Sequence, residues 1–343
     1  MTVLITGGAG YIGSHTVLCL LEQGFKVVVV DNYYNSSPES LCRVKKIIGS
    51  DFACYDGDIR DRALLNRIFS EHEIESVIHF AGLKSVGESV REPLTYYDNN
   101  VSGSIALLQE MNNFNVRKFI FSSSATVYGQ PESVPLSECS KIGGTTNAYG
   151  TSKLMVEQIL QDMAKAIPDF DITILRYFNP VGAHKSGLIG EDPNGIPNNL
   201  VPYISQVAAG KLQQVPVYGN DFPTKDGTGV RDYIHVMDLA DGHIAALKKQ
   251  TSGGCKIYNL GTGIGYSVLD LIKAYERAIE RPIPYVFAAR RAGDIAECWS
   301  DPSLALKELH WSATRNLDDM VRDSWNWQKA NPNGYEAQPL NGM

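Results

Sequence analysis

Several features are missing from this 343-residue chain, and each absence excludes a class of protein. No stretch approaches the roughly 18 consecutive apolar residues that a membrane-spanning helix needs. Met1 leads directly into an apolar strand-like run without a basic leader, so we expect no signal peptide. The six cysteines form no Cys-x-x-Cys pair and no Cys/His ligand pattern. We therefore expect reduced thiols, a cytoplasmic location and no metal site.

Charge of one sign is not concentrated anywhere in the chain. The sequence has 38 acidic and 31 basic residues, which gives a formal charge of -7, and neither sign forms long blocks. This pattern argues against a nucleic-acid surface or an anionic-membrane surface. We expect no nucleic-acid partner and no membrane partner.

The first half of the chain contains a regular alternation of short β-branched runs and longer helical patterns. The strand-like runs cover residues 3–6, 27–31, 52–55, 77–80, 119–122 and 172–176. Such alternation implies parallel strands with crossover helices, and strands that are apolar along their whole length suit a sheet covered on both faces. Residues 1–178 are therefore predicted to form a doubly wound (Rossmann) α/β domain.

The amino-acid composition changes after residue 178. Gly, Pro and Asn dominate residues 179–199, and loops of this length in a compact protein are usually functional or disordered. Helical and strand patterns return later, but too irregularly for a second large sheet. We predict a smaller C-terminal α/β substrate domain over residues 179–343, with a segment near residues 230–245 returning to the first domain.

A glycine-rich turn follows the first strand, at residues 6–13 (TGGAGYIG). Gly8, Gly10 and Gly13 satisfy GxGxxG between a strand and an apolar-faced helix, and Gly7 precedes them. This arrangement allows a tight turn, close approach of a pyrophosphate to the backbone, and anion binding at the helix N-terminus. The sequence therefore predicts a dinucleotide site.

Asp31 ends the second strand-like run, at about the spacing from the glycines where a carboxylate accepts hydrogen bonds from the adenosine ribose. Its negative charge would repel a 2'-phosphate, so NAD is favoured over NADP. Asp58 and Ile59 follow the third run and could flank the adenine. Asp58 is equally consistent with a helix-capping role.

Three polar side chains can converge on one alcohol. Tyr149 and Lys153 are four residues apart at the start of a helical pattern, so they project from one face. Ser124 closes a serine run after the strand at residues 119–121, at the sheet edge where doubly wound folds bind ligands. To act as a base near neutrality, a tyrosine with a pKa of about 10 must lose roughly three units. We expect the Lys153 ammonium and an oxidised nicotinamide to lower it.

With these motifs in place, the chain resembles the extended short-chain dehydrogenase/reductases, and within them the UDP-hexose 4-epimerases. Besides TGGAGYIG and Tyr149-x-x-x-Lys153, the supporting strings include HFAGLKSVGES at residues 79–89, FSSSATVYG at 121–129, RYFNPVGAH at 176–184 and DGTGVRDYIHVMDLADGH at 226–243. The resemblance covers most of the chain.

The resemblance implies an NAD cofactor and a UDP-sugar substrate. The residues that it places at NAD are Gly7, Gly10, Tyr11, Ile12, Gly13, Asp31, Asn32, Asn35, Ser36, Asp58, Ile59, Phe80, Ala81, Gly82, Lys84, Asn99, Ser124, Tyr149, Lys153 and Phe178. The residues that it places at the UDP-sugar are Asn179, Asn199, Leu200, Pro216, Val217, Tyr218, Arg231, Arg291, Asp294 and Cys298. The two arginines suit a diphosphate by charge and forked geometry.

The implied activity is an isomerisation that interconverts UDP-galactose and UDP-glucose, as galactose metabolism requires. Tyr149 would remove the proton of the sugar 4-hydroxyl while C4 gives a hydride to bound NAD. The resulting 4-keto sugar rotates in the site, and the hydride returns to its opposite face. Ser124 would hydrogen-bond the reacting oxygen, and Lys153 would orient the cofactor ribose.

Cys298 is the main departure, because relatives selective for plain hexoses often carry a tyrosine there. We hypothesise that the smaller side chain also admits UDP-N-acetylhexosamines. The resemblance further implies a homodimer, formed through the helices near residues 101–111 and 155–163.

Three rival functions remain to be weighed. A nucleotide-sugar 4,6-dehydratase would need carboxylates where Ala125 and Thr126 stand, so elimination is disfavoured. A related NAD-dependent sugar oxidoreductase would exchange its cofactor with the medium. A dinucleotide-binding module without activity would have lost the catalytic tyrosine or lysine, and both are present.

Overall fold

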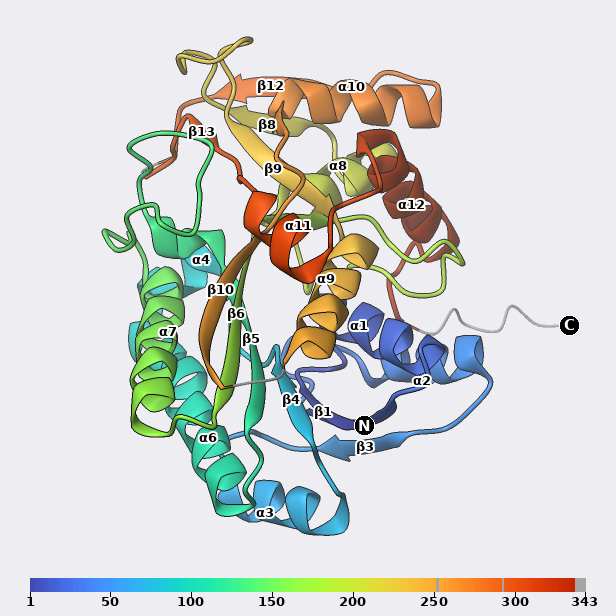
Figure 1. The fold of residues 1–343 in the computed structure, drawn as a ribbon. Helices are drawn as coiled ribbons and strands as arrows, with labels where there is room; N and C mark the ends of the chain where they lie inside the picture. Colours follow the sequence, from blue (N-terminus) through green and yellow to red (C-terminus); the bar gives the residue numbers. More distant parts are fainter. Residues whose placement is uncertain (251–252, 292, 337–343) are drawn as a thin grey trace, which may run out of the picture.

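The computed structural model of the chain describes residues 1–250, 253–291 and 293–336. Within these residues the strands form a seven-stranded sheet, a four-stranded sheet and a two-stranded sheet. Figure 1 shows the large sheet in the lower half of the molecule, between helices on either side, with the smaller sheets above it.

The large sheet is parallel throughout. Its strands are β1 (Thr2–Thr6), β2 (Lys26–Asp31), β3 (Ala53–Asp56), β4 (Ser76–His79), β5 (Lys118–Ser124), β6 (Asp171–Tyr177) and β10 (Gly254–Leu260). They lie in the order β10-β6-β5-β4-β1-β2-β3. The order reverses between β1 and β4, and ligands of doubly wound folds bind at such a point, beyond the carboxyl ends of the strands. The prediction of a doubly wound parallel sheet is confirmed.

Helices cover both faces of this sheet (Figure 1). On one side lie α1 (Tyr11–Glu22), α2 (Pro38–Ile48) and α9 (Val236–Lys249), and on the other α3 (Arg62–Glu71), α6 (Gly103–Asn113) and α7 (Ala148–Ala166). Helix α11 (Ser303–Leu309) packs on α9 and β10. Short elements follow β4 and β5, namely α4 (Val86–Arg91), α5 (Pro93–Tyr97), the π-helical turn η1 (Asp98–Ser102) and the 3-10 turn η2 (Ala125–Tyr128).

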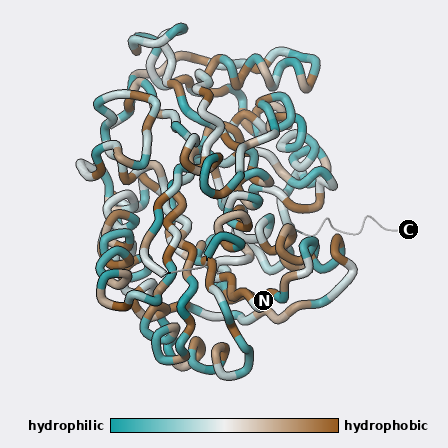
Figure 2. The backbone as a smooth tube through the Cα atoms, viewed as in Figure 1, coloured by the Kyte–Doolittle hydropathy of each residue, from teal (hydrophilic) through white to brown (hydrophobic). Residues whose placement is uncertain are grey.

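The core explains why the strands are apolar along their whole length. Successive residues of a strand point to opposite faces, so Val27 and Val29 pack with one group of helices while Val28 and Val30 pack with the other. All four are buried. Figure 2 shows hydrophobic stretches along the strands of the large sheet. A one-sided sheet would have placed polar residues at alternate positions.

The second half builds a smaller, less regular layer. Strand β9 (Val230–His235) is central and pairs with β7 (Asn179–Val181), β11 (Gly265–Ser267) and β13 (Glu297–Cys298), while β8 (Val215–Tyr218) pairs only with β12 (Tyr285–Ala288). Three helices, α8 (Leu200–Ala208), α10 (Val268–Ile279) and α12 (Leu317–Ala330), pack together beside them. This layer has its own apolar core, which includes Ile204, Tyr233 and Leu271.

The expected return segment differs from the structure. Strand β9 stays in the smaller layer, and only the helix that follows it, α9, returns to pack on α1. The strand that returns is β10, which pairs with β6 and was not predicted. The reason is that α9 begins directly after β9, so the chain crosses between the halves at His235. The two halves are interleaved, and the domain limits at residues 178 and 179 stay a prediction.

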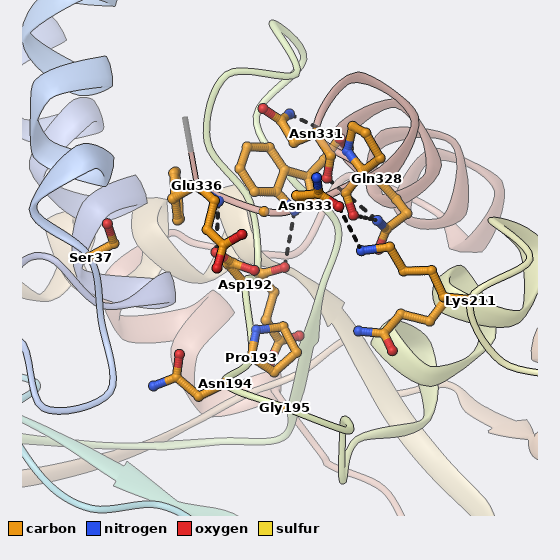
Figure 3. Close-up of a pocket in the computed structure, with 16 residues that line it drawn as sticks. Ser37, Asp192, Pro193, Asn194, Gly195, Lys211, Gln328, Asn331, Asn333 and Glu336 are labelled. Atoms are coloured by element: carbon orange, nitrogen blue, oxygen red, sulfur yellow. Dashed lines mark hydrogen bonds between the residues drawn. The ribbon is translucent and has the colours of Figure 1, made fainter. Parts of the chain in front are cut away.

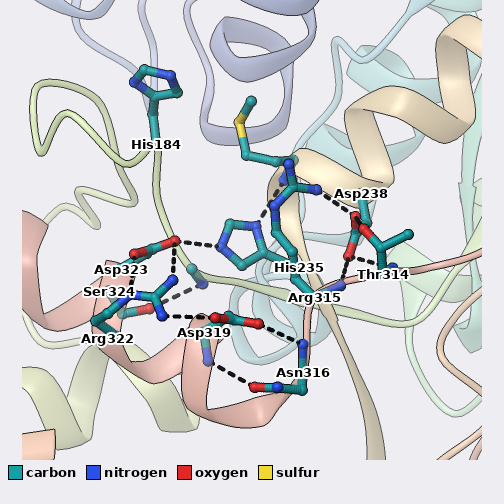
Figure 4. Close-up of polar contacts among 12 residues, drawn as sticks. His184, His235, Asp238, Thr314, Arg315, Asn316, Asp319, Arg322, Asp323 and Ser324 are labelled. Carbon is teal, nitrogen blue, oxygen red and sulfur yellow. Dashed lines mark hydrogen bonds and ion pairs between the residues drawn. The ribbon is translucent and has the colours of Figure 1, made fainter.

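Buried polar contacts join the halves where the chain crosses (Figure 4). His235 Nε2 lies 3.2 Å from a carboxylate oxygen of Asp323 on α12. Asp238 on α9 accepts a hydrogen bond of 3.0 Å from the Thr314 hydroxyl and forms an ion pair with Arg315. These contacts fix α12 of the smaller layer against α9 of the larger one.

Three findings concern the described residues as a whole. No helix among them has the length and apolar character that crossing a bilayer requires. All six cysteines lie in this part of the chain as free thiols. In the same residues, no group of three or more His, Cys, Asp or Glu side chains is placed to hold a metal ion.

Candidate active site

The glycine-rich turn joins β1 to α1 by direct backbone packing. Gly7 has φ +70°, and a Cβ on it would lie 2.6 Å from the Ala81 nitrogen. A Cβ on Gly13 would lie 2.2 Å from the Gly7 carbonyl oxygen. Larger residues would push α1 away from the turn, so these glycines keep the helix end close to the carboxyl edge of the sheet.

Helix α1 presents an open N-terminus to that edge. Gly10 is its N-cap residue, no described side chain caps it, and the first turn contains no acidic residue. The first backbone N–H groups of a helix have no intrahelical acceptor, so those of Tyr11 and Ile12 can bind an anion. The predicted pyrophosphate position therefore has matching donors in the structure.

Asp31 lies beside this turn and is buried. Its carboxylate accepts hydrogen bonds from the Ala9 N–H at 2.9 Å, the Tyr33 N–H at 2.9 Å and the Ser36 hydroxyl at 2.8 Å. Two carboxylate oxygens offer about four acceptor positions, so capacity remains for a ligand hydroxyl. Asp31 thus shapes the loop after β2, on which Asn35 is exposed.

Asp58 and Ile59 take different positions at the neighbouring edge. Asp58 accepts from the Asn32 side chain at 3.0 Å, and Arg60 beside it holds the pKa of that carboxyl at about 2. Ile59 is buried against Gly103. The structure therefore brings Asn32 and Asp58 together, but Asp58 caps no helix, because the α3 cap is Asp61.

The loop after β4 completes the cofactor side. The N–H groups of Phe80 and Ala81 both donate to the Thr6 carbonyl, at 3.0 and 3.1 Å, so this loop continues from the glycine turn. Gly82 approaches the Lys153 ammonium, since a Cβ on it would lie 3.8 Å from Nζ. Lys84 is exposed.

Asn100 supports the loop after β4, a role that was not predicted from the sequence. Its side chain accepts from the Leu83 N–H at 2.8 Å and donates to the Leu83 carbonyl at 3.0 Å and the Ser152 hydroxyl at 2.9 Å. Asn99, which is predicted to contact NAD, is partly buried. The double Asn of residues 99–100 was the available signal, and only the fold distinguishes the two.

Tyr149, Lys153 and Ser124 come together at the carboxyl end of β5. Helix α7 begins where the Asn147 side chain accepts from the Gly150 N–H at 2.9 Å, which places Tyr149 in its first turn. All three side chains are buried. Lys153 donates to the Ser122 carbonyl at 2.8 Å, and Tyr149 is hydrogen-bonded to Ser124.

Burial raises the pKa of Tyr149 above its usual value in the chain alone, and hydrogen bonds from Ser124 and Tyr177 oppose that rise only partly. The Lys153 ammonium is directed to the Ser122 carbonyl. Its effect on Tyr149 beside an oxidised nicotinamide stays a prediction. Burial also lowers the pKa of Lys153, to about 8.

A cavity of about 410 Å³ lies in the smaller layer, where its lining residues fall between Asn179 and Ile295. Eight of the ten predicted UDP-sugar residues line it, namely Asn179, Asn199, Leu200, Pro216, Tyr218, Arg231, Arg291 and Asp294. The other two do not. The Val217 side chain is buried in the core of the smaller layer, because it points opposite to its neighbours on β8, so only its backbone could contribute. Cys298 packs with Phe178 and Val127 beneath the cavity.

The two arginines give the cavity positive charge. Both act on the buried hydroxyl of Tyr233, opposing the rise of its pKa to about 12 that burial causes. Arg291 stacks over the Tyr218 ring with its guanidinium 4.7 Å from the ring centre and pairs with Asp294 at 3.1 Å. Arg231 donates to the Val230 carbonyl at 2.8 Å. Such cations suit a diphosphate.

Glu191, which was not predicted, contacts one residue predicted at NAD and one predicted at the UDP-sugar. Its carboxylate lies 3.6 Å from the Lys84 ammonium and accepts from the Asn199 amide at 3.3 Å. A second cavity of about 450 Å³ adjoins this residue on the outside (Figure 3). Polar groups around Asp192 and Lys211 line that hollow, and none of the predicted catalytic residues does.

The fold and these groups define a class: a dinucleotide-binding α/β enzyme with a buried Tyr-x-x-x-Lys pair and a cavity lined by two arginines. Residues 3–261 match the family described as "NAD dependent epimerase/dehydratase family". The chain belongs to this family.

Known relatives extend the similarity over nearly the whole chain. The UDP-glucose 4-epimerase of Yersinia enterocolitica is 67% identical over 98% of this chain and 100% of its own length. The solved structure of UDP-glucose 4-epimerase from Bifidobacterium longum in complex with NAD+ and UDP has a TM-score of 0.95 at 59% identity, covering 97% of this chain and 100% of that one. That of the Stenotrophomonas maltophila enzyme, with bound NAD and formylated UDP-arabinopyranose, has a TM-score of 0.94 at 50% identity, covering 97% and 99%.

Proposed function

We propose that this chain is a UDP-hexose 4-epimerase that interconverts UDP-galactose and UDP-glucose. The observation that carries the proposal is the buried group of Tyr149, Lys153 and Ser124 at the carboxyl end of β5. The open N-terminus of α1 and a cavity lined by two arginines support it. Relatives named UDP-glucose 4-epimerase match over nearly the full chain. The enzyme is accordingly an isomerase, and the 4,6-dehydratase reading is not favoured.

The cofactor is NAD. The residues present fit it, because the α1 N-terminus offers donors to a pyrophosphate and Asp31 retains acceptor capacity for a ribose. A carboxylate at that place also opposes a 2'-phosphate. When bound, NAD supplies a hydride acceptor for the sugar C4 and gives the hydride back.

Residues of the chain carry out the proton transfer from the sugar 4-hydroxyl. The Tyr149 oxygen takes the proton of the sugar 4-hydroxyl, and Ser124 holds the same oxygen by a hydrogen bond. Burial raises the pKa of Tyr149 in the chain alone, and the positive charge of Lys153 and of an oxidised cofactor would favour its phenolate. Lys153, which donates to the Ser122 carbonyl, would also hold the cofactor ribose.

Elimination of water lacks its acid and base here. The positions after Ser124 are Ala125 and Thr126, which start the 3-10 turn η2. Neither side chain can exchange a proton at neutral pH. The first oxidation step is therefore followed by return of the hydride.

The test is to incubate purified protein with UDP-galactose, without added NAD, and to measure UDP-glucose. Formation of UDP-glucose without free NADH supports epimerisation with retained cofactor. Sugar oxidation that requires added NAD and releases an equal amount of free NADH would support the oxidoreductase instead, and release of UDP-4-keto-6-deoxyglucose would support the dehydratase.

We also propose that UDP-N-acetylhexosamines are substrates. Cys298 on β13 is paired in register with Arg231, which lines the cavity. We expect its small side chain to leave room for an N-acetyl group. Cys298→Tyr should abolish conversion of UDP-GalNAc to UDP-GlcNAc while UDP-galactose turnover continues. Wild-type protein without activity on UDP-GalNAc would exclude this substrate range.

The chain is further proposed to act as a homodimer. Helices α4 and α5 pack on α7, and together with α6 they expose the apolar side chains of Val90, Leu94, Ile105 and Met155. Leu94 is 80% exposed, and a dimer contact through these helices would cover it. Light scattering should give the dimer mass for wild type and the monomer mass for Leu94→Glu/Met155→Glu. A wild-type monomer at micromolar concentration would contradict the proposal.

A cytoplasmic location completes the proposal. All six cysteines are free thiols, and Cys42 and Cys139 are exposed, which suits a reducing compartment. Fractionation of the source cells should recover UDP-galactose epimerising activity with cytosolic markers. Recovery with secreted or membrane markers would refute it.

A further inference from the structure

Three titratable residues share one buried face of α7. Tyr149, Lys153 and Glu157 are four residues apart, so they follow one another along the helix. Their relative exposures are 6%, 5% and 0%. The first two belong to the proposed active site. The third, Glu157, has no role in the proposed proton transfer, yet a fully buried carboxylate is unusual unless it is paired.

Glu157 is held by both neighbouring strands. The Ser123 hydroxyl on β5 donates to its carboxylate at 2.6 Å. Arg176 on β6, which is 1% exposed, donates to the two carboxylate oxygens over distances of 2.7–3.2 Å. One turn earlier, Lys153 donates to the Ser122 carbonyl at 2.8 Å. Consecutive residues of β5 therefore bind consecutive turns of α7.

The surroundings of Lys153 supply little other negative charge. Beyond Glu157, the groups that face it are neutral: His79 on β4 and His243 on α9 have pKa values that burial lowers to about 3 and 4, and Asn100 on η1 carries an amide. Its ammonium also lies 4.7 Å from the centre of the Phe121 ring on β5. Tyr149 on α7 and Tyr177 on β6 are protonated, because burial raises both pKa values.

The charges beyond Glu157 are also accounted for. On β6, Arg176 continues to the Tyr128 hydroxyl of η2 at 3.2 Å, and Cys255 on β10 is a neutral thiol because burial raises its pKa to about 12. The acidic residues of the elements before α7 are directed elsewhere: Glu88 of α4 accepts from Tyr96, and Asp98 of η1 pairs with Arg60. Glu157 is the carboxylate whose charge acts on Lys153.

We propose that Glu157 is a positioning residue of the reaction: its carboxylate, clamped by Ser123 and Arg176, keeps Lys153 in the ammonium form and fixes the turn of α7 that carries Lys153 and Tyr149. This inference rests on the proposed epimerase function, since it assigns a role to a residue behind the same site. Glu157 touches neither substrate nor cofactor and acts through Lys153.

The direction of the effect follows from charge. Burial lowers the pKa of Lys153 to about 8, and the negative charge of Glu157 works against that lowering. Without the carboxylate, the Lys153 pKa falls further, so the ammonium is lost at lower pH. Activity that needs the ammonium is then lost at lower pH too, and the alkaline limb of the pH profile moves in the acidic direction.

The first experiment compares the pH dependence of kcat for wild type and Glu157→Gln, with UDP-galactose as substrate. A charge one helical turn away is expected to move the alkaline limb by about one pH unit or more. At pH 6 both proteins should turn over within about threefold of each other, because Lys153 is protonated in both. Glu157→Asp, which keeps the charge, should keep the wild-type limb even if its rate is lower.

A matched control separates this effect from the general loss of a buried carboxylate. Glu110 on α6 is also buried and is bound by Arg62 of α3 at 2.6 Å, in a pair that does not contact Lys153. Glu110→Gln should therefore reduce thermal stability while its alkaline limb coincides with that of wild type. An equal shift in Glu110→Gln would assign the effect to stability and overturn the inference.

A second variant covers the case in which Glu157→Gln fails to fold because Arg176 is left unpaired. Replacing a buried ion pair by apolar residues is often tolerated, so Glu157→Met/Arg176→Met should fold and still show the acidic shift. If wild type turns over UDP-galactose but a folded variant without the carboxylate keeps the wild-type limb, the role of Glu157 is wrong. If wild type shows no turnover at any pH, the proposed function itself fails.

Discussion

The two sides of the proposed site hold their polar residues in opposite ways. On the cofactor side, Lys153 and Asp31 are 5% and 7% exposed, and each is fixed by hydrogen bonds to backbone groups. On the sugar side, the Arg291 side chain is 56% exposed and is held by Asp294, three residues further along the same loop. Asp31 and Lys153 lie on β2 and α7, in the layer of the large sheet, whereas Arg291 and Asp294 lie on the loop between β12 and β13.

This difference indicates a division of tasks. A cofactor that stays bound through many turnovers needs a site with its donors and acceptors fixed in advance. A substrate that enters and leaves needs side chains that can reach it and release it. A sugar ring that must present both faces during one cycle adds the same requirement, because its pocket has to accommodate two orientations.

The strongest way to break this comparison is to alter the buried side at the proposed reacting group. Tyr149→Phe is expected to lower kcat by about 10²–10⁴-fold, since a positioned acid–base group contributes that much. NAD should stay bound, because the helix N-terminus and Asp31 are untouched. Both quantities can be measured on one sample, by UDP-galactose turnover and by NAD released on denaturation.

The control is Tyr97→Phe, a partly buried ring beside Tyr149 in the same apolar cluster. It should keep wild-type turnover. Full activity of Tyr149→Phe would mean that Tyr149 is not the acid–base group. Loss of NAD from it would mean that the cofactor also depends on the Tyr149 hydroxyl.

The second prediction tests the backbone of the cofactor side. In Gly13→Ala the methyl group would lie 2.2 Å from the Gly7 carbonyl oxygen, so α1 has to move. We expect loss of bound NAD and of about 1–3 kcal/mol in the free energy of unfolding. In Gly87→Ala the nearest atom lies at 3.9 Å, at the end of the Arg91 side chain. That control should keep its NAD and unfold at the wild-type temperature or slightly above. Equal NAD content in both variants would contradict the proposed pyrophosphate site.

The regular side was also the more predictable side. The strands from β1 to β6 lie within one or two residues of the expected runs. Strands β1, β2 and β4 are buried almost throughout, whereas β3 is only partly buried. Strand β10 was missed because Lys256 and Asn259 interrupt its apolar character. Its place in the sheet depends on pairing with β6, which is distant in sequence.

The site residues show the same limit, which is that a contact between elements distant in sequence cannot be predicted from the sequence. Tyr149 and Lys153 could be predicted because one helix sets their spacing. Asn100 and Glu157 could not, since their partners come from other elements, as with Ser152 on α7 and Arg176 on β6. Spacing within one element can be seen in a sequence, whereas contacts between elements need the fold.

The third prediction concerns acid stability, to which the buried side is more sensitive. His15 on α1 is fully buried, and burial lowers its pKa from 6.5 to about 3. Between these values the unfolded chain binds a proton that the folded chain does not, so stability falls as pH drops below 6.5. At pH 5 one such imidazole costs about 2 kcal/mol relative to pH 7.

In His15→Phe the loss of unfolding free energy between pH 7 and pH 5, measured with denaturant, should be smaller than in wild type by that amount. His310→Asn, at an exposed turn residue with positive φ, should leave the difference unchanged. If His15→Phe has the wild-type pH dependence, the acid sensitivity lies elsewhere than on the buried side.

The smallest effect is expected at Arg291 on the exposed sugar side, and it changes KM where Tyr149→Phe changes kcat. Arg291→Ala removes a cation from the cavity but no group near the reacting carbon, so KM for UDP-galactose should rise by about tenfold with little change in kcat. Arg290→Ala is the matched control, because Arg290 pairs with Asp221 at 2.7 Å and covers the Phe222 ring instead of lining the cavity. If both variants raise KM equally, the positive field of the loop as a whole attracts the substrate. If only Arg291→Ala raises KM, the exposed Arg291 side chain acts by direct contact with the substrate. The two sides of the site then differ in how mobile their side chains are, and both bind their ligands specifically.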